Sequence, residues 1–252
     1  MKYIEIKKPE LNYYSAEACK SLRTNFQFCG SNKKAIVFTS CTQNEGKTYI
    51  ILNLAISLSE IGKKVLLLDA DLRKSALLGR VDATGSMKGL THFLSKQASL
   101  VDIICQTNVP NFYMAFAGPV PPNPSELLSS TYFEHMLEAL RESYDYILID
   151  SPPLGSVVDS AIIASKSDGS VIVIEEGWNS YRFEQDIKRQ LEKTNTPILG
   201  VILNKVDYSR SSYYGKYGKY GKYGKYGKYE TPYGNGYPGS IQHENRCMIA
   251  LL

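Results

Sequence analysis

Short apolar runs alternate with longer amphipathic stretches along most of this chain. Six of the runs read as strands, and most of these are continuously apolar, which is the pattern of strands that are buried on both faces. They cover residues 35–40, 64–70, 112–117, 144–150, 169–176 and 197–204. Apolar positions at helical spacing predict helices at residues 15–28, 48–61, 124–142 and 181–194. This alternation predicts an α/β fold, in which helices cover both faces of a parallel sheet.

Two local signals mark the ends of predicted helices. Gly62 follows the helix at 48–61, at the position where glycine commonly ends a helix. Asn123, Pro124 and Glu126 occupy the N-cap, N1 and N3 positions of the helix at 124–142, an arrangement that predicts a capping box.

The apolar pattern ends near residue 207. Beyond it, Tyr, Gly and Lys repeat with a three-residue period, and the repeat contains no branched aliphatic residue. Such a composition cannot bury a core, so it predicts disorder. We therefore divide the chain into a folded domain, residues 1–207, and a flexible Tyr/Gly/Lys-rich tail, residues 208–252.

Charge is distributed unevenly between these two parts. The chain of 252 residues has a net charge of +4, and residues 208–240 carry six basic side chains against one acidic side chain, or +5. Because Glu244 and Arg246 cancel, the folded domain is near −1. This distribution argues against a globally basic nucleic-acid binder.

Cysteine usage and the length of the apolar runs indicate the compartment. The five cysteines are scattered and never in CxxC spacing, which is typical of idle thiols in a reducing cytoplasm. No stretch approaches the ~20 apolar residues of a spanning helix, and the N-terminus lacks a signal-peptide pattern. We therefore expect a cytoplasmic protein whose membrane association, if any, comes through a partner.

Residues 41–48 (CTQNEGKT) carry the first candidate chemistry. They match the phosphate-binding loop pattern G-x-x-x-x-G-K-[ST], except that Cys41 replaces the first glycine. The segment follows a predicted strand and opens a predicted helix, so backbone N–H groups can point at an anion. Lys47 adds positive charge at the phosphates, and the Thr48 hydroxyl can ligate Mg²⁺. The predicted fold is therefore a P-loop NTPase-like sheet.

Acidic residues follow two of the predicted strands. LLLDADLR places Asp69 and Asp71 at the end of one strand, and YILIDSPP places Asp150 at the end of another. In a parallel sheet these ends lie at the edge where ligands bind. Carboxylates at that edge suit Mg²⁺, which prefers oxygen ligands.

Together these motifs resemble the Walker A, A′ and B set of bacterial tyrosine kinases. The segments GPVPPNPSELL (118–128) and LNKVD (203–207), with the tyrosine-rich tail, are similar to the CpsD/CapB-type cytosolic autokinases of Gram-positive capsule and exopolysaccharide operons. The resemblance covers about residues 15–237. It implies a protein-tyrosine kinase that uses ATP and Mg²⁺, phosphorylates its own tail, and thereby regulates polysaccharide synthesis and export.

The resemblance also assigns roles to individual residues. Lys47 would hold the phosphates, Thr48 would bind Mg²⁺, and Asp150 would hold Mg²⁺ through water. Asp69 would act as the base or as a metal ligand, with Asp71 beside it. The implied catalytic set is Lys47, Asp69, Asp71 and Asp150, and the implied metal set is Thr48, Asp69 and Asp150. The implied nucleotide-binding set, in which Asn204 lies near the adenine, is Gln43, Asn44, Glu45, Gly46, Lys47, Thr48, Tyr49 and Asn204.

In such a kinase the tail supplies the acceptors, and it can reach the active site of a neighbouring copy within a homo-oligomer such as a ring. The predicted acceptors are Tyr213, Tyr214, Tyr217, Tyr220, Tyr223, Tyr226, Tyr229, Tyr233 and Tyr237. The family's ring-forming motif Glu-x-x-Arg-x-x-Arg is similar to Glu17, Lys20 and Arg23 here. The resemblance further implies a membrane-embedded activator or adaptor, whose cytosolic segment recruits the kinase to the inner face of the membrane, and a cognate phosphotyrosine phosphatase.

Several positions depart from the family pattern. Gln43 and Asn44 stand where the family often has Pro-Gly, although asparagine tolerates left-handed backbone better than most residues. Tyr49 is bulkier than the small residue that usually follows the Ser or Thr. Lys20 keeps the charge of an arginine but loses its bidentate fork, which would weaken ring contacts.

Four alternatives stay open at this stage. A ParA/MinD-type partitioning ATPase shares the fold, but Thr42 stands where its signature lysine would be. Residues 204–207 (NKVD) fit the N-K-x-D guanine-binding pattern of a GTPase. The interleaved Tyr and Lys of the tail could instead stack on single-stranded nucleic acid. The departures from the family pattern leave a non-catalytic nucleotide-binding regulator as the fourth alternative.

Overall fold

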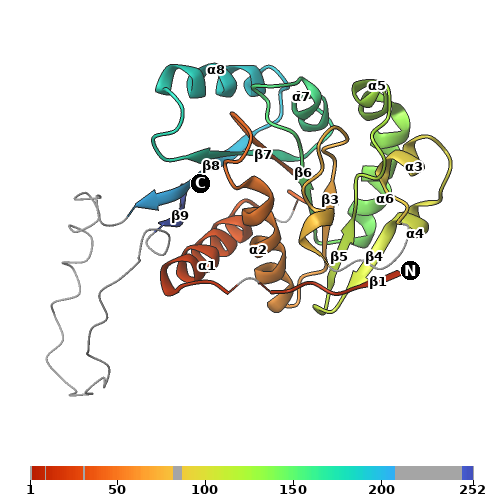
Figure 1. The fold of residues 1–252 in the computed structure, drawn as a ribbon, viewed down its shortest axis with the longest axis horizontal. Coiled ribbons are helices and arrows are strands. Elements are labelled where there is room, and N and C mark those ends of the chain that lie inside the picture. Colours follow the sequence, from red (N-terminus) through yellow and green to blue (C-terminus); the bar gives the residue numbers. More distant parts are fainter. Residues whose placement is uncertain (1, 9, 31, 82–86, 208–245, 252) are drawn as a thin grey trace, which may run out of the picture.

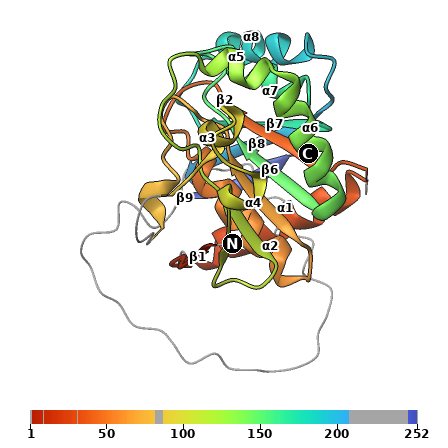
Figure 2. The same ribbon diagram turned by 90° about the vertical axis from the view of Figure 1, so that its right-hand side faces the viewer.

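The computed structural model describes residues 2–8, 10–30, 32–81, 87–207 and 246–251. Its centre is a nine-stranded sheet in the order β1-β4-β5-β3-β6-β2-β7-β8-β9 (Figure 1, Figure 2). The strands are β1 (Lys2–Ile4), β2 (Ala35–Ser40), β3 (Val65–Asp69), β4 (Ile104–Thr107), β5 (Phe112–Ala115), β6 (Tyr146–Asp150), β7 (Gly169–Glu175), β8 (Ile198–Asp207) and β9 (Arg246–Leu251). Neighbouring strands are parallel except for β4 with β5 and β8 with β9. The α/β prediction is therefore confirmed, with an antiparallel pair added towards each edge.

Helices cover both faces of this sheet (Figure 1). The longer helices are α1 (Tyr13–Phe28), α2 (Lys47–Glu60), α6 (Thr131–Ser143) and α8 (Tyr181–Glu192). The shorter ones are α3 (Leu90–Leu94), α4 (Leu100–Ile103), α5 (Pro124–Ser129), α7 (Asp159–Ala164) and the 3-10 turn η1 (Leu78–Arg80). α1 and α2 pack on one face, and the helices from α3 to α8 pack on the other. Across the described ranges, none of the helices combines the length and the apolar character that a membrane span requires.

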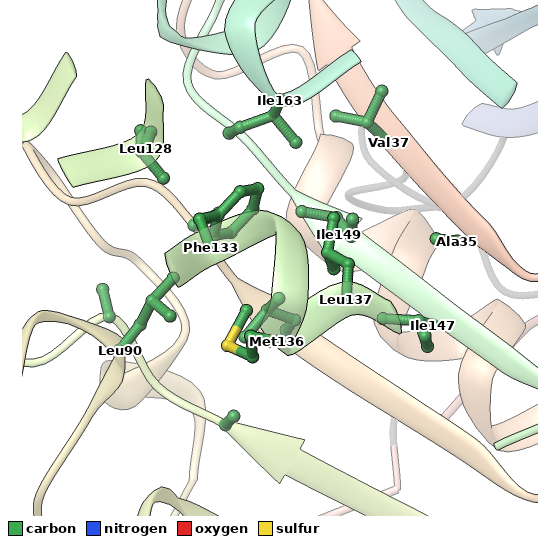
Figure 3. Close-up of a cluster of buried hydrophobic side chains, with 14 of the residues drawn as sticks. Ala35, Val37, Leu90, Leu128, Phe133, Met136, Leu137, Ile147, Ile149 and Ile163 are labelled. Atoms are coloured by element: carbon green, nitrogen blue, oxygen red, sulfur yellow. The ribbon is translucent and has the colours of Figure 1, made fainter. Parts of the chain in front are cut away.

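Alternate residues of the central strands enter opposite cores. Ile36 and Phe38 of β2 pack with α1 and α2, while Val37 packs in the core beneath α6. All six residues of β2 are buried, which explains why the strand reads as a continuous apolar run. Figure 3 shows the second core, which Phe133 of α6 and Ile149 of β6 share.

The helix predicted at 124–142 is two helices, and the predicted capping box is wrong in part. Ser130 has extended backbone (φ −62°, ψ 151°), which ends α5, and its hydroxyl accepts from the Phe133 N–H at 3.3 Å, which begins α6. Asn123 is the N-cap residue and Pro124 follows it, but the Asn123 side chain accepts no backbone hydrogen bond. Its amide nitrogen donates to Glu126 Oε2 at 2.7 Å instead, so the two side chains satisfy each other.

Gly62 ends α2 as predicted. Its φ is +83°, its N–H donates to the Ser59 carbonyl at 3.0 Å, and the Lys63 N–H donates to the Leu58 carbonyl at 3.2 Å. These two hydrogen bonds are those of a Schellman motif, in which a glycine adopts the left-handed conformation without steric cost.

Three strands at the margins of the sheet were not predicted. β1 and β4 are short and partly exposed, so they lack the long apolar run of the central strands. β9 falls within the segment assigned to the flexible tail, yet it pairs antiparallel with β8, with Arg246 opposite Asp207. The apolar run at residues 248–251 favours this pairing, since it satisfies an edge that β8 would leave open. Residues 208–245 lie outside the described residues, so the division at residue 207 stays a prediction.

Candidate functional site

A cavity of about 680 Å³ lies at the carboxyl ends of β2 and β6, beside the loop that follows β3. This volume is within the range of small-molecule sites. The predicted site residues that line it are Gln43, Asn44, Glu45, Gly46, Lys47, Thr48, Tyr49, Asp71, Asp150 and Asn204. Asp69 does not line the cavity, but it is the register partner of Asp150 in the adjacent strand. The fold thus brings all the predicted nucleotide, metal and catalytic residues together.

The loop between β2 and α2 has the backbone of an anion-binding loop. Asn44 and Gly46 are both left-handed, with φ of 66° and 87°. Asn44 thus adopts the left-handed backbone that asparagine tolerates better than most residues. Gly46 is the N-cap residue of α2 and has no side-chain acceptor for the first N–H groups of the helix, which an anion can satisfy instead.

Lys47 and Thr48, the first residues of α2, both contact Asp150. Lys47 Nζ forms an ion pair with Oδ1 of Asp150, and Thr48 Oγ1 donates to Oδ2 at 2.6 Å. Lys47 and Asp150 are only 9% and 2% exposed, so water screens this pair weakly. The candidate phosphate-binding cation and the candidate Mg²⁺ donors are therefore in direct contact.

Asp69 is buried beside Asp150, and its acidity is altered. Burial and, to a smaller extent, the charge of Asp150 raise the pKa of Asp69 to about 7. Hydrogen bonds from Ser75 Oγ and from the Asp71 N–H lower this pKa but do not outweigh the first two effects. A carboxyl group with a pKa near neutrality can take up and release a proton at physiological pH. Ser75 also lines the cavity, so its hydroxyl connects Asp69 to the cavity wall.

The loop that follows β3 is braced by side chains. Asp71 Oδ1 accepts from the backbone N–H groups of Arg73 at 3.2 Å and Lys74 at 2.9 Å. Arg73 donates through Nε at 2.7 Å and Nη2 at 3.1 Å to Asp159 of α7, which is fully buried. Ser125 of α5 donates to the same carboxylate at 2.6 Å. Side chains of two helices, α5 and α7, thus hold this loop.

The carboxylate of Glu45 is held in an internal network of hydrogen bonds. It is 1% exposed, and Oε1 accepts from the Thr42 N–H, from Thr42 Oγ1 at 2.7 Å and from Asn179 Nδ2 at 3.0 Å. Oε2 accepts from the Glu175 N–H at 3.1 Å. The Glu45 carbonyl accepts from Asn204 Nδ2 at 2.8 Å. Glu45 therefore shapes the loop, and only its backbone is available to a bound anion.

The NKVD segment also supports this loop. Lys205 has left-handed backbone (φ 57°), and its Nζ donates to the Asn44 carbonyl at 2.8 Å and to Glu175 Oε2 at 2.6 Å. The first two residues of the apparent guanine-binding pattern, Asn204 and Lys205, thus contact the phosphate-binding loop directly.

Four supporting residues were missed by the sequence analysis: Ser125, Asp159, Glu175 and Asn179. Each contacts a site residue that is distant in the chain, so no local spacing could reveal the contact. Ser125 lies within the segment 118–128 that carries part of the family resemblance, which was the one available signal.

Tyr49 and the N-terminal part of α1 form another wall of the cavity, together with Asn12 and Ser15. Of the three residues predicted to contact a second copy, Glu17 and Lys20 form an exposed ion pair at 2.7 Å. Arg23 Nη1 instead donates to the Ser57 carbonyl of α2 at 3.2 Å. The nine predicted acceptor tyrosines lie outside the described residues.

The residues present fit a magnesium nucleotide. A Cβ atom at Gly46 would lie 2.1 Å from Asn204 Nδ2, so only glycine fits where the loop approaches Asn204. Thr48 and Asp150 offer oxygen atoms, which are the donors that Mg²⁺ prefers. In the described part of the chain, no group of three or more His, Cys, Asp or Glu residues is placed to hold a metal ion.

A loop of this shape, with a buried lysine at the start of a helix and acidic ends on neighbouring parallel strands, defines a P-loop nucleotide-binding protein. The family model described as "AAA domain" matches residues 33–184. The sequence is 47% identical over 205 residues to the tyrosine-protein kinase CpsD of Streptococcus agalactiae. The matched region covers 79% of this chain and 90% of that protein. The chain belongs to the CpsD-type family of tyrosine-protein kinases.

Solved structures agree with this assignment. The kinase domain of the Escherichia coli tyrosine kinase ETK has a TM-score of 0.73 and 29% identity, over 88% of this chain and 80% of that one. The chimerical protein CapA2B2 has a TM-score of 0.72 and 28% identity, over 82% and 94%. MinD of Pyrococcus horikoshii, complexed with Mg-ADP, has a TM-score of 0.58 over 71% of this chain. The ParA/MinD alternative is therefore the weaker one.

Proposed function

We propose that this tyrosine-protein kinase transfers the terminal phosphoryl group of ATP to tyrosines of its own C-terminal tail. The observation that carries this proposal is the joint placement of Lys47, Thr48 and Asp150 in one cavity, with Asp69 beside Asp150 on the adjacent strand. A tract of regularly spaced tyrosines follows β8 in the sequence, and the end of β8 contacts the phosphate-binding loop through Asn204.

Lys47, Thr48 and the N–H groups of the loop would bind the phosphates of ATP and the metal ion. When bound, ATP supplies the phosphoryl group and Mg²⁺ offsets the charge on the phosphates. Lys47 and the N–H groups at the start of α2 would orient the phosphates, and Thr48 and Asp150 would hold the ion, directly or through water. Lys47 and Thr48 both contact Asp150, so the fold itself holds these groups together.

Asp69 would act as the base for the acceptor tyrosine. A tyrosine hydroxyl has an ordinary pKa of ~10, so its oxygen attacks the phosphorus more readily when a base removes the proton. The pKa of Asp69, which burial and Asp150 raise to about 7, suits a group that accepts this proton and later releases it. The new bond joins the tyrosine oxygen to phosphorus, the bond between phosphorus and the bridging oxygen breaks, and ADP leaves.

The tail would be phosphorylated by neighbouring copies in a homo-oligomer such as a ring. A flexible chain of ~30 residues spans roughly 30 Å, so acceptors on one copy would reach the cavity of the next at high effective concentration. Each phosphotyrosine adds about −1.5 to −2 charges, so about three of them would cancel the +5 of residues 208–240. Further modification would reverse the charge of the tail, and repulsion between the negatively charged tails would then loosen the oligomer.

The wider setting follows from the family. We expect a membrane-embedded activator whose cytosolic segment recruits this cytoplasmic protein to the inner face of the membrane, and a phosphatase that resets the tail. The output would be control of capsule or exopolysaccharide synthesis and export. α1 would supply part of the oligomer contact through Glu17 and Lys20, which are exposed, with less from Arg23, which contacts α2.

The test is mass spectrometry of the full chain after incubation with Mg²⁺ and ATP, beside a Lys47→Met variant. Phosphate on tyrosines between Tyr213 and Tyr237 in the wild type alone is the expected result. Mixing unlabelled wild type with ¹⁵N-labelled Lys47→Met protein resolves the direction, because phosphate on the labelled chains can arise only in trans. ATP hydrolysis without phosphotyrosine would overturn the proposal and favour the regulatory ATPase.

A further inference from the structure

Four basic side chains line the cavity, namely Lys47, Arg73, Lys74 and Lys205. Three of them are paired with carboxylates. Lys47 pairs with Asp150, Arg73 with Asp159 at 2.7 Å, and Lys205 with Glu175 at 2.6 Å.

Lys74 differs from the other three in its partner. Its Nζ donates to the neutral amide oxygen of Gln43 at 3.3 Å, and it forms no ion pair with any residue that the structure describes. Within that part of the chain, Lys74 is therefore the one cation of the cavity wall whose charge no carboxylate offsets.

The backbone around Lys74 is held on both sides. Its own N–H donates to Asp71 Oδ1 at 2.9 Å, the preceding residue Arg73 is tied to Asp159, and the Ser75 hydroxyl donates to Asp69. The side chain of Lys74 is exposed and extends from this fixed loop across to Gln43 of the phosphate-binding loop. A bound polyanion between the two loops would meet it.

We propose that Lys74 is a second phosphate-binding cation, which contacts the terminal phosphates of the bound nucleotide and bridges the loop after β3 to the phosphate-binding loop. The inference rests on the proposed function for the identity of the ligand. Its physical basis is charge. Asp69, Asp71 and Asp150 concentrate negative charge beside the site, and a triphosphate adds more, so an uncompensated ammonium group at that position lowers the energy of the bound state.

The test compares nucleotides that differ in phosphate number. Dissociation constants for ATP, ADP and AMP are measured by calorimetry with Mg²⁺ on the full chain, for wild type, Lys74→Ala and Lys74→Arg. A charged contact of the usual strength predicts that Lys74→Ala weakens ATP binding about tenfold or more, weakens ADP binding less, and leaves AMP binding nearly unchanged. Lys74→Arg keeps the charge and restores most of the ATP affinity.

Lys88→Ala is the matched control, because Lys88 is exposed outside the cavity and only loosely paired with Asp102 at 3.7 Å. Equal losses for ATP and AMP in Lys74→Ala, or unchanged ATP affinity, would overturn the inference. The binding experiment decides the role of Lys74 separately from the kinase reaction. A wild type that binds ATP without phosphorylating tyrosine defeats the proposed function alone, whereas a wild type that binds no nucleotide defeats both.

Discussion

The side-chain amide of Asn204 donates a hydrogen bond of 2.8 Å to the Glu45 carbonyl and so joins the end of β8 to the phosphate-binding loop. The next residue, Gly46, has a φ of +87°, and a Cβ atom there would lie 2.1 Å from the same amide nitrogen. Two segments that are far apart in the sequence thus fit together only because Gly46 has no side chain. The shape of the loop depends on the strand that precedes the tail.

Gly46→Ala is expected to disrupt both binding and stability. An L-residue in left-handed backbone costs roughly 1–2 kcal/mol, and the clash with Asn204 adds to that cost because the amide must give up its bond to Glu45. We expect lost nucleotide binding in calorimetry and a lower melting temperature.

Gly62→Ala is the matched control for this substitution. Gly62 has almost the same backbone, with a φ of +83°, but nothing lies within 4 Å of its would-be Cβ atom. It therefore reports the backbone cost alone, and nucleotide affinity should stay at the wild-type value. Equal stability losses in the two variants would show that the clash with Asn204 has no effect.

The central part of the fold could be predicted from the sequence because its signals are local. Each of the six apolar runs became a strand, since burial on both faces demands apolar residues at every position. Ser130 interrupted one predicted helix because its hydroxyl caps the second half, and helical periodicity cannot detect such a break. The pattern of β1, β4 and β9, at the margins of the sheet, was too short or too mixed to predict a strand.

The candidate site, too, could be predicted only in part from the sequence. The loop motif and the strand-end aspartates predicted which residues meet, since parallel strands place their carboxyl ends at one edge. The sequence could not show that Lys47 would contact Asp150, that Glu45 would turn inward, or that Asp159 would anchor Arg73. Those contacts depend on the three-dimensional placement of loops, which has no periodic signature.

Asp69→Asn is expected to stabilise the protein at pH 8 while abolishing tyrosine phosphorylation. The folded-state pKa of Asp69 is raised to about 7 by burial and by Asp150, whereas an unfolded aspartate titrates near ~3.9. The folded state therefore binds the proton more tightly, and stability falls as pH rises from about 4 to about 7. Removing the charge removes that cost, so the melting temperature should rise by several degrees at pH 8 and change little at pH 4.

The same pKa sets the pH dependence of the reaction. A base must be deprotonated, so kcat/KM of the wild type should rise through about pH 7 as Asp69 ionises.

Asp186→Asn, at an exposed ion pair with Arg189, serves as the control for the Asp69→Asn melting experiment and should have a small effect at both pH values. A destabilised Asp69→Asn protein at pH 8 would contradict this account.

Asp159→Ala is expected to lower the free energy of unfolding by about 1–3 kcal/mol, because it removes the buried carboxylate that accepts hydrogen bonds from Arg73 and Ser125. Burial by itself raises the pKa of Asp159, but hydrogen bonds from Arg73 and Ser125 outweigh it and hold the pKa below its usual value. Its contribution is therefore present above about pH 4 and is lost as pH falls below that value.

Urea unfolding at pH 7 and at pH 3 measures the effect of Asp159→Ala, with Asp186→Ala as the control. The control removes an exposed carboxylate from a pair of the i,i+3 type and should change stability by less than about 1 kcal/mol. Similar losses in the two variants at pH 7 would mean that the Arg73–Asp159 pair does not hold the loop after β3.

Glu45→Gln and Glu184→Gln make the same chemical change and should have opposite effects. Oε1 of Glu45 accepts from the Thr42 N–H and from Asn179 Nδ2, and Oε2 accepts from the Glu175 N–H. A glutamine presents an NH₂ group to one of these sets of donors, which costs about 1–3 kcal/mol and distorts the phosphate-binding loop.

Burial, and next the charge of Glu45, raise the pKa of Glu184, so neutralising Glu184 relieves repulsion at neutral pH. The measurements are thermal unfolding and ATP titration at pH 7.5. Glu45→Gln should be less stable and bind ATP more weakly, whereas Glu184→Gln should be unchanged or slightly more stable. A loss of stability in both variants would indicate that Glu184 has a supporting role of its own.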